Sequence, residues 1–176
     1  MSIKVYDDFL DPQEFSELNT IALSSDFPWY FNRCITHHTE ERTFGQFTHT
    51  FYRVNEGVIS EFASKFVGFL RTQIENVHAD SDVIIVSSKM NLNVMRDDHY
   101  PIGTFHVDRV IPGDIHKTAI FYLNTNDGFT KFETGKIVKS EANRIVIFDG
   151  NINHHGYTCT DAQTRIILNV NYLVLP

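Results

Sequence analysis

The chain has 176 residues and a formal net charge of −7. This length suits one domain with a full hydrophobic core. The 42% hydrophobic content is ordinary for a globular protein and excludes a disordered or collagen-like chain. The negative charge disfavours nonspecific binding to a nucleic-acid backbone. We therefore expect a single domain over residues 1–176 with no strong nucleic-acid signal.

No stretch approaches the roughly 18 consecutive apolar residues of a membrane-spanning helix. The first residues lack the basic and then apolar pattern of a secretory signal. Two cysteines, Cys34 and Cys159, are too few for a disulfide framework. We expect a cytoplasmic protein with no membrane partner, and we interpret Cys159 as a structural residue.

Two segments of the N-terminal half are predicted to be helices. Residues 11–24 begin with Asp11 as a plausible N-cap and Pro12 in the first turn, as helices often do. Residues 57–77 carry apolar side chains at helical spacing. Between them, residues 27–31 resemble a loop and residues 43–53 a strand. The two helices should pack on a sheet.

The pattern changes after Asp82 to short β-rich runs separated by turn signals. The runs cover 83–86, 91–95, 116–124, 145–148 and 165–174, and the turns cover 100–103, 112–114, 126–128, 149–151 and 160–161. This spacing is typical of an antiparallel sandwich or jelly roll and not of alternating βαβ units. The sequence predicts a mainly β fold, with a helical segment over about 1–82 and a jelly-roll core over about 83–176.

The first candidate metal motif is Phe105-His106-Val107-Asp108. On a strand, residues two apart project from the same face, so an imidazole and a carboxylate at this spacing can converge on one ion. A His-x-Asp sequence is common by chance and is weak evidence alone. The value of this motif as evidence depends on the other candidate ligand residues in the chain.

A second motif follows an apolar strand, where residues 144–149 lead through a turn to His154 and His155. A single histidine in such a place is more often an ordinary surface or core residue than a ligand.

A third motif is the strand 164–172, on which Arg165, Ile167, Asn169 and Asn171 share one face. A buried arginine needs an anionic partner, and its planar fork fits a carboxylate. That partner could be a ligand or an internal Asp or Glu.

In this order, the motifs resemble those of the 2-oxoglutarate and iron(II) dependent oxygenases, specifically the prolyl 4-hydroxylase-like branch with its short phage members. The corresponding residues are His106, Asp108, Tyr122 within Phe-Tyr-Leu-Asn, His154 and Arg165. The resemblance covers about residues 88–172. It implies a double-stranded β-helix (cupin-like) core braced by helices.

The resemblance also implies a metal site. His106, Asp108 and His154 would be the catalytic iron ligands, with His155 as the alternative to His154 because the distance to Arg165 is one residue longer than is common. Two imidazoles and one carboxylate leave open positions on iron. Zinc is a weaker candidate because no thiolate lies nearby in the sequence.

The same resemblance implies the co-substrate site. Arg165 would bind the far carboxylate of 2-oxoglutarate, helped by Tyr122, Thr118 and Asn169. Many relatives carry a tyrosine on the strand before His-x-Asp, where this chain has residues 93–95, Asn-Val-Met. Co-substrate contacts from that strand therefore stay open.

The implied reaction is hydroxylation of a substrate C–H bond with O2, coupled to conversion of 2-oxoglutarate into succinate and carbon dioxide. Ascorbate is a candidate stimulant. A protein or peptide substrate, such as peptidyl proline, is favoured over a nucleobase or small metabolite. Candidate rim residues are the loops 96–103 and 109–113 and the stretch 51–53. The alternative from another class is a non-catalytic binding module on the same fold.

Overall fold

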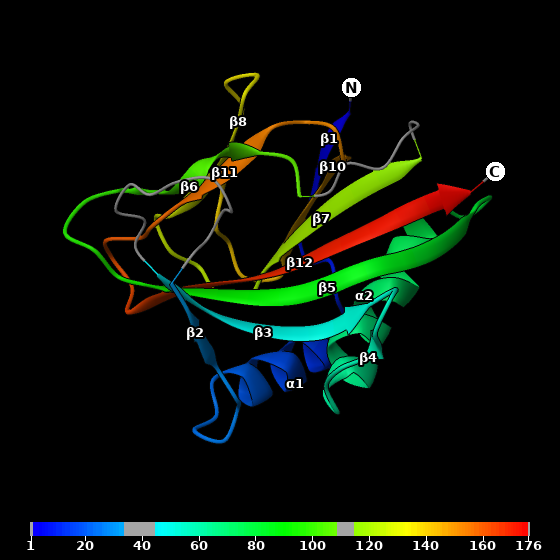
Figure 1. The fold of residues 1–176 in the computed structure, drawn as a ribbon, viewed down its shortest axis with the longest axis horizontal. Helices are drawn as coiled ribbons and strands as arrows, with labels where there is room; N and C mark the ends of the chain where they lie inside the picture. Colours follow the sequence, from blue (N-terminus) through cyan, green and yellow to red (C-terminus); the bar gives the residue numbers. More distant parts are fainter. Residues whose placement is uncertain (1, 34–44, 109–114, 176) are drawn as a thin grey trace.

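The computed structural model describes residues 2–33, 45–108 and 115–175. Over these residues, a pair of antiparallel sheets face each other (Figure 1). The large sheet has the order β1-β10-β7-β12-β5-β3-β2, with β4 beside β3. The small sheet has the order β6-β11-β8-β9. The arrangement confirms the predicted jelly-roll core.

The strands of the large sheet are β1 (Ile3–Tyr6), β2 (Tyr30–Asn32), β3 (Gln46–Arg53), β4 (Gly57–Val58), β5 (Asp82–Val94), β7 (His116–Tyr122), β10 (Arg144–Asp149) and β12 (Thr164–Leu175). Those of the small sheet are β6 (Pro101–His106), β8 (Phe129–Phe132), β9 (Ile137–Lys139) and β11 (His154–Tyr157). Strands β1 to β4 precede residue 83, so the N-terminal segment supplies strands as well as helices.

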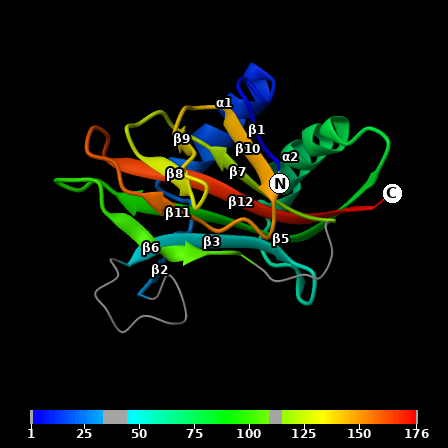
Figure 2. The ribbon, with the colours of Figure 1, turned by 90° about the horizontal axis from the view of Figure 1, so that it is seen from above.

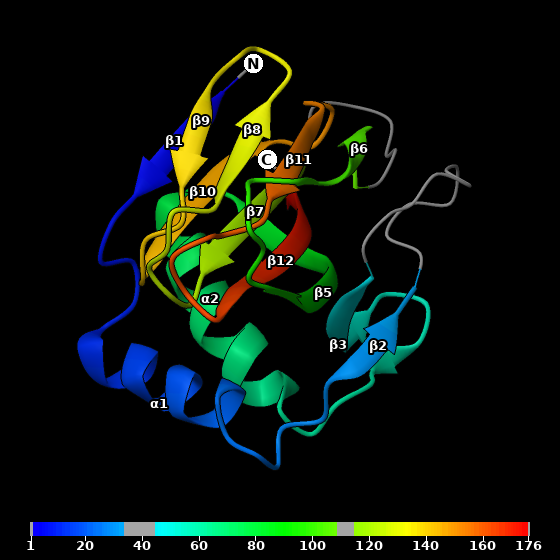
Figure 3. The same ribbon diagram turned by 90° about the vertical axis from the view of Figure 1, so that its left-hand side faces the viewer.

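Two helices, α1 (Pro12–Ala22) and α2 (Ala63–Val77), cover the face of the large sheet that points away from the small sheet (Figures 1 and 3). Helix α1 begins as predicted, because the Asp11 side chain accepts a hydrogen bond from the Gln13 backbone N–H at 2.8 Å and Pro12 follows the cap. Within the described residues, no helix is long and apolar enough to cross a bilayer.

The large sheet separates two apolar layers, since alternate side chains of a strand point to opposite faces. On β7, Ala119 and Phe121 pack toward the helices, where Leu70 and Ile74 of α2 also lie. Ile120 and Tyr122 point instead into the space between the two sheets. Figure 2 shows the small sheet lying over β12 and β5. The space between the sheets is therefore closed on two sides by strands.

Helix α2 begins at Ala63, and the prediction that it begins near Gly57 was wrong. Gly57 adopts a left-handed φ of 78° and pairs through β4 with Arg53. The Ser60 hydroxyl then accepts the backbone N–H of Phe62. A turn and a strand pair therefore occupy the beginning of the apolar pattern that predicted a helix.

Two further predictions were wrong. The runs 83–86 and 91–95 form one strand, β5, because it pairs along most of its length with β12. Residues 101–103 belong to β6 and not to a turn, since β6 pairs with β11 and proline is tolerated at the first position of a strand. The predicted turn 112–114, the rim loop 109–113 and Cys34 lie outside the described residues.

The helix-side core should dominate stability. Leu70 is fully buried, so Leu70→Ala should lower the free energy of unfolding by about 2–5 kcal/mol through lost burial and the cavity left behind. Urea denaturation followed by circular dichroism measures this. Leu23 is 63% exposed, and Leu23→Ala should change stability by about 0.5 kcal/mol or less. Equal effects of the two substitutions would contradict this packing.

Candidate active site

The two histidines of the site are brought together by strand pairing. His106 ends β6 and His154 begins β11, and these two residues are register partners. Their ring centroids lie 5.0 Å apart. The antiparallel pairing of β6 and β11 therefore places the two imidazoles side by side.

Asp108 completes the cluster from beyond the end of β6. Its Oδ1 lies 3.6 Å from Nε2 of His106, and its Oδ2 lies 3.7 Å from Nε2 of His154. One ligand atom from each residue fits within 4.8 Å of the others. Strand alternation was the sequence argument for His106 and Asp108, but β6 stops at His106. Another contact must position the carboxylate.

That contact comes from the large sheet. The Asn169 amide donates to Asp108 Oδ2 at 2.8 Å, and the Asn171 amide donates to Asn169 Oδ1 at 2.9 Å. The Thr118 hydroxyl donates to Asn171 Oδ1 at 3.0 Å. A directed chain of hydrogen bonds therefore fixes Asp108 relative to β12 and β7.

Both imidazoles present the same nitrogen to the cluster. Nδ1 of His106 lies 2.8 Å from the Thr104 carbonyl, and Nδ1 of His154 lies 3.2 Å from the Ile152 carbonyl. A carbonyl accepts only from an N–H, so each Nδ1 carries a proton, and Nε2 is the nitrogen that each ring can offer to a metal. Backbone acceptors fix metal-binding histidines in this way.

Electrostatics also suit a cation. Burial by itself raises the pKa of Asp108, but the hydrogen bond with His106, the charge of His154 and the hydrogen bond from Asn169 outweigh it and hold the pKa well below the ordinary value. Burial lowers the pKa of His154. The cluster therefore favours one carboxylate beside a neutral imidazole, which is the form that binds a metal.

The cluster opens on a cavity of about 230 Å³ between the two sheets. Ile102, Ile120 and Ile167 form its apolar wall, and Asp108 is the one carboxylate among the described lining residues. Arg165 lines the same cavity. A small molecule in this space would contact both the cluster and the guanidinium.

Arg165 is a buried cation, 1% exposed. Its Nε donates to the Ser140 hydroxyl at 2.9 Å and its Nη2 to the Thr130 hydroxyl at 3.2 Å. The guanidinium lies 5.6 Å from the centroid of the Tyr122 ring. Across the described portion of the chain, no Asp or Glu forms an ion pair with it. Burial accordingly lowers the pKa of Arg165.

Two glycines leave room for this side chain. A Cβ on Gly128 would lie 2.7 Å from Cδ of Arg165, and a Cβ on Gly156 would lie 3.3 Å from its Nη1. The Gly128 contact is closer than real Cβ atoms approach other atoms. Glycine at position 128 therefore permits the observed path of Arg165 into the cavity.

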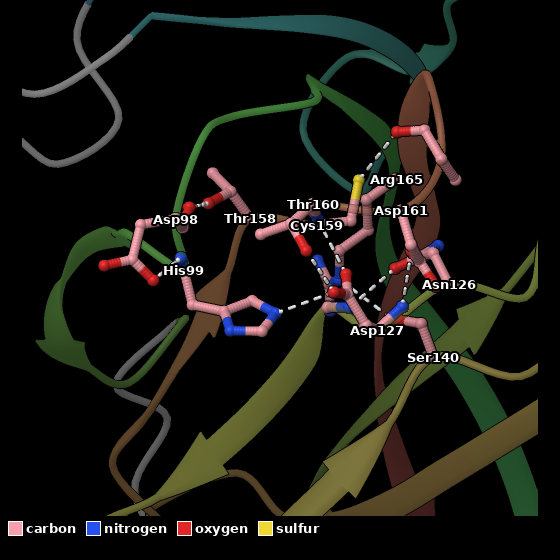
Figure 4. Close-up of polar contacts among 12 residues, drawn as sticks. Asp98, His99, Asn126, Asp127, Ser140, Thr158, Cys159, Thr160, Asp161 and Arg165 are labelled. Carbon is pink, nitrogen blue, oxygen red and sulfur yellow. Dashed lines mark hydrogen bonds and ion pairs between the residues drawn. The ribbon is translucent and has the colours of Figure 1, made fainter.

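Three loops are tied together beside Arg165 (Figure 4). The Asp127 carboxylate accepts the Thr160 backbone N–H at 2.7 Å and the Thr160 hydroxyl, and it lies 3.2 Å from Nε2 of His99. Asp161 in turn accepts the Asp127 backbone N–H at 2.9 Å. The buried Cys159 thiol donates to the Ala162 carbonyl, and burial raises its pKa. These contacts hold the end of the barrel at which β12 begins.

The other predicted residues have different surroundings. His155 lies outside the three-residue cluster and packs its ring against Phe105 with centroids 4.1 Å apart. Tyr122 donates its hydroxyl to Thr130 at 2.8 Å. Like Thr118, it is fully buried and does not line the cavity. Asn169 lines the cavity and is bonded to Asp108.

The prediction that residues 51–53 lie at the rim of the substrate site was wrong for two of the three residues. A register shift between Thr50 and Tyr52 sends Phe51 and Tyr52 into the helix-side core, so that Arg53 alone of the three lines the cavity.

Several residues that line the cavity or bind Arg165 were not predicted from the sequence. Thr130 and Ser140, which bind Arg165, lie in or beside short strands with no distinctive pattern. Lys89 carries a usable signal, because polar residues alternate along β5 at positions 87, 89, 91 and 93, and this period of two predicts one polar face.

Solved structures share this fold. A 2OG-Fe(II) oxygenase family oxidoreductase from Burkholderia pseudomallei aligns with a TM-score of 0.69 and 14% identity, over 97% of this chain and 85% of that one. A prolyl hydroxylase from Trichoplax adhaerens, solved with a hypoxia inducible factor peptide, aligns with a TM-score of 0.64 and 12% identity, over 97% and 83%. A prolyl-4-hydroxylase from Pseudomonas putida aligns with a TM-score of 0.60 and 16% identity, over 99% and 92%.

No protein-family model matches the sequence, and the search of curated proteins gives no match. At these identities the structural likeness establishes the fold, which is the fold that the motif resemblance implied.

The hydrogen bond from Asn169 should matter for metal affinity. Asn169→Ala leaves Asp108 without its amide donor, so the dissociation constant for Fe(II) or Mn(II) should rise about 10–100-fold, as for other losses of support to a ligand. Anaerobic equilibrium titration measures it. Asn76→Ala on the outer helix is the control and should leave affinity unchanged. Unchanged affinity in Asn169→Ala would remove Asn169 from the metal-binding apparatus.

The loops around Asp127 should give a pH-dependent contribution to stability. Burial raises the pKa of the Asp127 carboxyl, but hydrogen bonds from Thr160 and His99 lower this pKa to about 2 in the folded protein. An unfolded chain has a value of about 3.9. This stabilisation should be present above about pH 4 and lost as the pH falls through about 2.

Asp127→Asn should therefore lower the free energy of unfolding at pH 6 by on the order of 1 kcal/mol, given the partial exposure, and by much less near pH 2.5. Urea denaturation at both pH values tests this, with exposed Asp80→Asn as the control. If Asp127→Asn lowers the free energy of unfolding equally at both pH values, the carboxylate charge is not the cause.

Proposed function

We propose that the protein is an Fe(II)- and 2-oxoglutarate-dependent dioxygenase that hydroxylates a C–H bond and releases succinate and carbon dioxide. The observation that carries the proposal is the buried, ion-pair-free guanidinium of Arg165 in the same cavity as the His106, Asp108 and His154 cluster, within the residues that the structure describes. The oxygenase fold of the aligned structures supports it.

The donor set fits ferrous iron. His106 and His154 each present an Nε2 lone pair and Asp108 presents a carboxylate, which is the two-histidine, one-carboxylate set of non-haem iron oxygenases. Ferrous iron held there supplies the redox chemistry that couples O2 and 2-oxoglutarate to oxidation of the substrate.

The cavity also fits the co-substrate. Arg165 would bind the far carboxylate of 2-oxoglutarate bidentately, while Ser140 and Thr130 hold the guanidinium in place. Ile120 and Ile167 line the same cavity as Arg165 and the cluster and would help to exclude water from it. Tyr122 supports the cation through its ring. Thr118 supports Asp108 through the asparagine chain.

For the substrate, we favour a protein or peptide, with peptidyl proline first. The motifs resemble those of prolyl hydroxylases, and two of the aligned structures are prolyl hydroxylases. A nucleobase or small metabolite would use the same iron ligands and the same arginine, and would differ only at the rim. We also propose a cytoplasmic location and ascorbate as a stimulant.

The direct test is to add Fe(II) and 2-oxoglutarate to anaerobic protein, separately and together, and to record the weak visible charge-transfer band of the chelated keto acid. The band should require both reagents. His154→Ala should abolish it because one ligand is lost. Arg165→Ala should raise the 2-oxoglutarate concentration needed by about 100-fold or more, since a charge-assisted bidentate contact is lost.

His155→Ala is the matched control for His154→Ala and should keep the band at wild-type intensity. If the band never forms in folded wild-type protein, the oxygenase proposal fails. If His155→Ala abolishes the band and His154→Ala does not, the ligand assignment is reversed.

A further inference from the structure

Strand β5 presents a polar face to the cavity. Lys89, Asn91 and Asn93 all line it. In the sheet register, Lys89 is the partner of Asn169 on β12 and of Thr50 on β3. Asn169 is bonded to Asp108, so the lysine lies one strand away from the residue that positions a metal ligand. Asn93 is instead the register partner of Arg165.

Lys89 has no ion-pair partner among the residues that the structure describes, and no hydrogen bond from its side chain is found there. It is half-buried in the cavity wall. Burial lowers its pKa, and the opposing effect of an acidic group comes from Asp108. Asp108 is the proposed metal ligand, so its charge would be shared with the ion. Burying a lysine charge in such a wall is energetically unfavourable unless an anion binds it.

The charges of the proposed complex leave Lys89 uncompensated. The positive charges of ferrous iron and Arg165 balance the negative charges of Asp108 and the two carboxylates of 2-oxoglutarate. Arg53, the other cation of the wall, pairs with Glu56 at 2.8 Å. Lys89 also lies beside the reaction centre. Neither the described residues nor the co-substrate provides a counter-charge for it.

Neighbouring polar groups add to this surface. The Asn91 Oδ1 atom is buried without a hydrogen-bond partner among the described residues. Gln46 and Asn93 are 4% and 5% exposed and also line the cavity. A purely apolar substrate would leave the Asn91 oxygen without a hydrogen bond, which is unfavourable for a buried polar atom. The wall suits a charged or strongly polar ligand.

We infer that Lys89 is a specificity-determining residue that binds a carboxylate of the substrate beside the metal cluster. This inference rests on the proposed function and narrows its substrate class to carboxylates. The carboxylate can belong to a free small acid or to an acidic residue next to the target in a peptide. A second cavity of about 450 Å³ shares Thr50 and Arg53 with the first.

The test compares carboxylates with their uncharged carboxamides. Anaerobic protein loaded with Fe(II) and 2-oxoglutarate is titrated with acetate and acetamide, with L-proline and L-prolinamide, and with end-blocked Ala-Pro-Glu-Ala and Ala-Pro-Gln-Ala. Binding is read as a change in the charge-transfer band, without turnover. The free-acid and peptide pairs distinguish the two sources of the carboxylate.

In wild-type protein, the carboxylate of at least one pair should change the charge-transfer band at a concentration about tenfold or more below that of its carboxamide. Lys89→Met keeps the side-chain length, removes the charge and should abolish this preference. Lys89→Arg should retain it. Lys65→Met, on an exposed helix position, is the matched control and should behave as wild type. The 2-oxoglutarate concentration required for the band should change less than about threefold in Lys89→Met.

Three results would overturn the inference: no pair shows a preference in wild type, the preference survives in Lys89→Met, or Lys89→Met weakens 2-oxoglutarate binding as much as probe binding. The last result would assign Lys89 to the co-substrate. A wild-type protein that forms no band overturns the proposed function and this inference together, so the two failures are distinguishable. Circular dichroism of Lys89→Met confirms that the variant is folded.

Discussion

A guanidinium buried between two sheets, with no carboxylate of the described residues paired to it, is the constraint on which this barrel depends. Removing a charge from water costs several kcal/mol unless hydrogen bonds and an opposite charge compensate it. Ser140, Thr130 and the Tyr122 ring compensate Arg165 partially. Gly128 leaves space for its stem, and the loops around Asp127 close the end of the barrel where β12 begins. The arrangement is costly for a structural arginine and reasonable for an anion receptor.

The second constraint is the His106, Asp108 and His154 cluster, which lines the same cavity. His106 and His154 become neighbours through the pairing of β6 and β11, while Asp108 is held by Asn169 from the opposite sheet. The cluster therefore joins the two sheets. Any movement between them would change both the ligand spacing and the distance to Arg165, so a rigid sandwich is a condition for binding one small molecule at both ends.

Much of this architecture was predictable from sequence, because the signals were local. The period of two on β12 correctly placed Arg165, Ile167 and Asn169 on one face, and the cap at Asp11 fixed the start of α1. Apolar helical spacing failed at 57–62, where a left-handed glycine and pairing with β3 decide the structure. Proline and glycine at 101–103 suggested a turn, yet pairing with β11 makes this segment a strand.

The residues of the candidate metal cluster could be named from the sequence, whereas the residues that support them could not. His106, Asp108 and Arg165 were chosen by residue type and order, but Thr130 and Ser140 reach Arg165 only through tertiary contacts that no local pattern encodes. The choice between His154 and His155 needed the register of β11, which directs one ring to the cluster and the other toward Phe105. Residues two apart can share a face of a strand, yet only the structure shows where the strand ends.

We propose that one cavity binds both a metal, at the His106, Asp108 and His154 cluster, and a carboxylate, at Arg165. The most direct measurement is a crystal structure of the protein grown anaerobically with Fe(II) and 2-oxoglutarate. We expect a metal ligated by Nε2 of His106, Nε2 of His154 and the Asp108 carboxylate, with the far carboxylate of 2-oxoglutarate on the Arg165 guanidinium. Metal bound through His155, or an Asp or Glu side chain of the protein occupying Arg165, would contradict it.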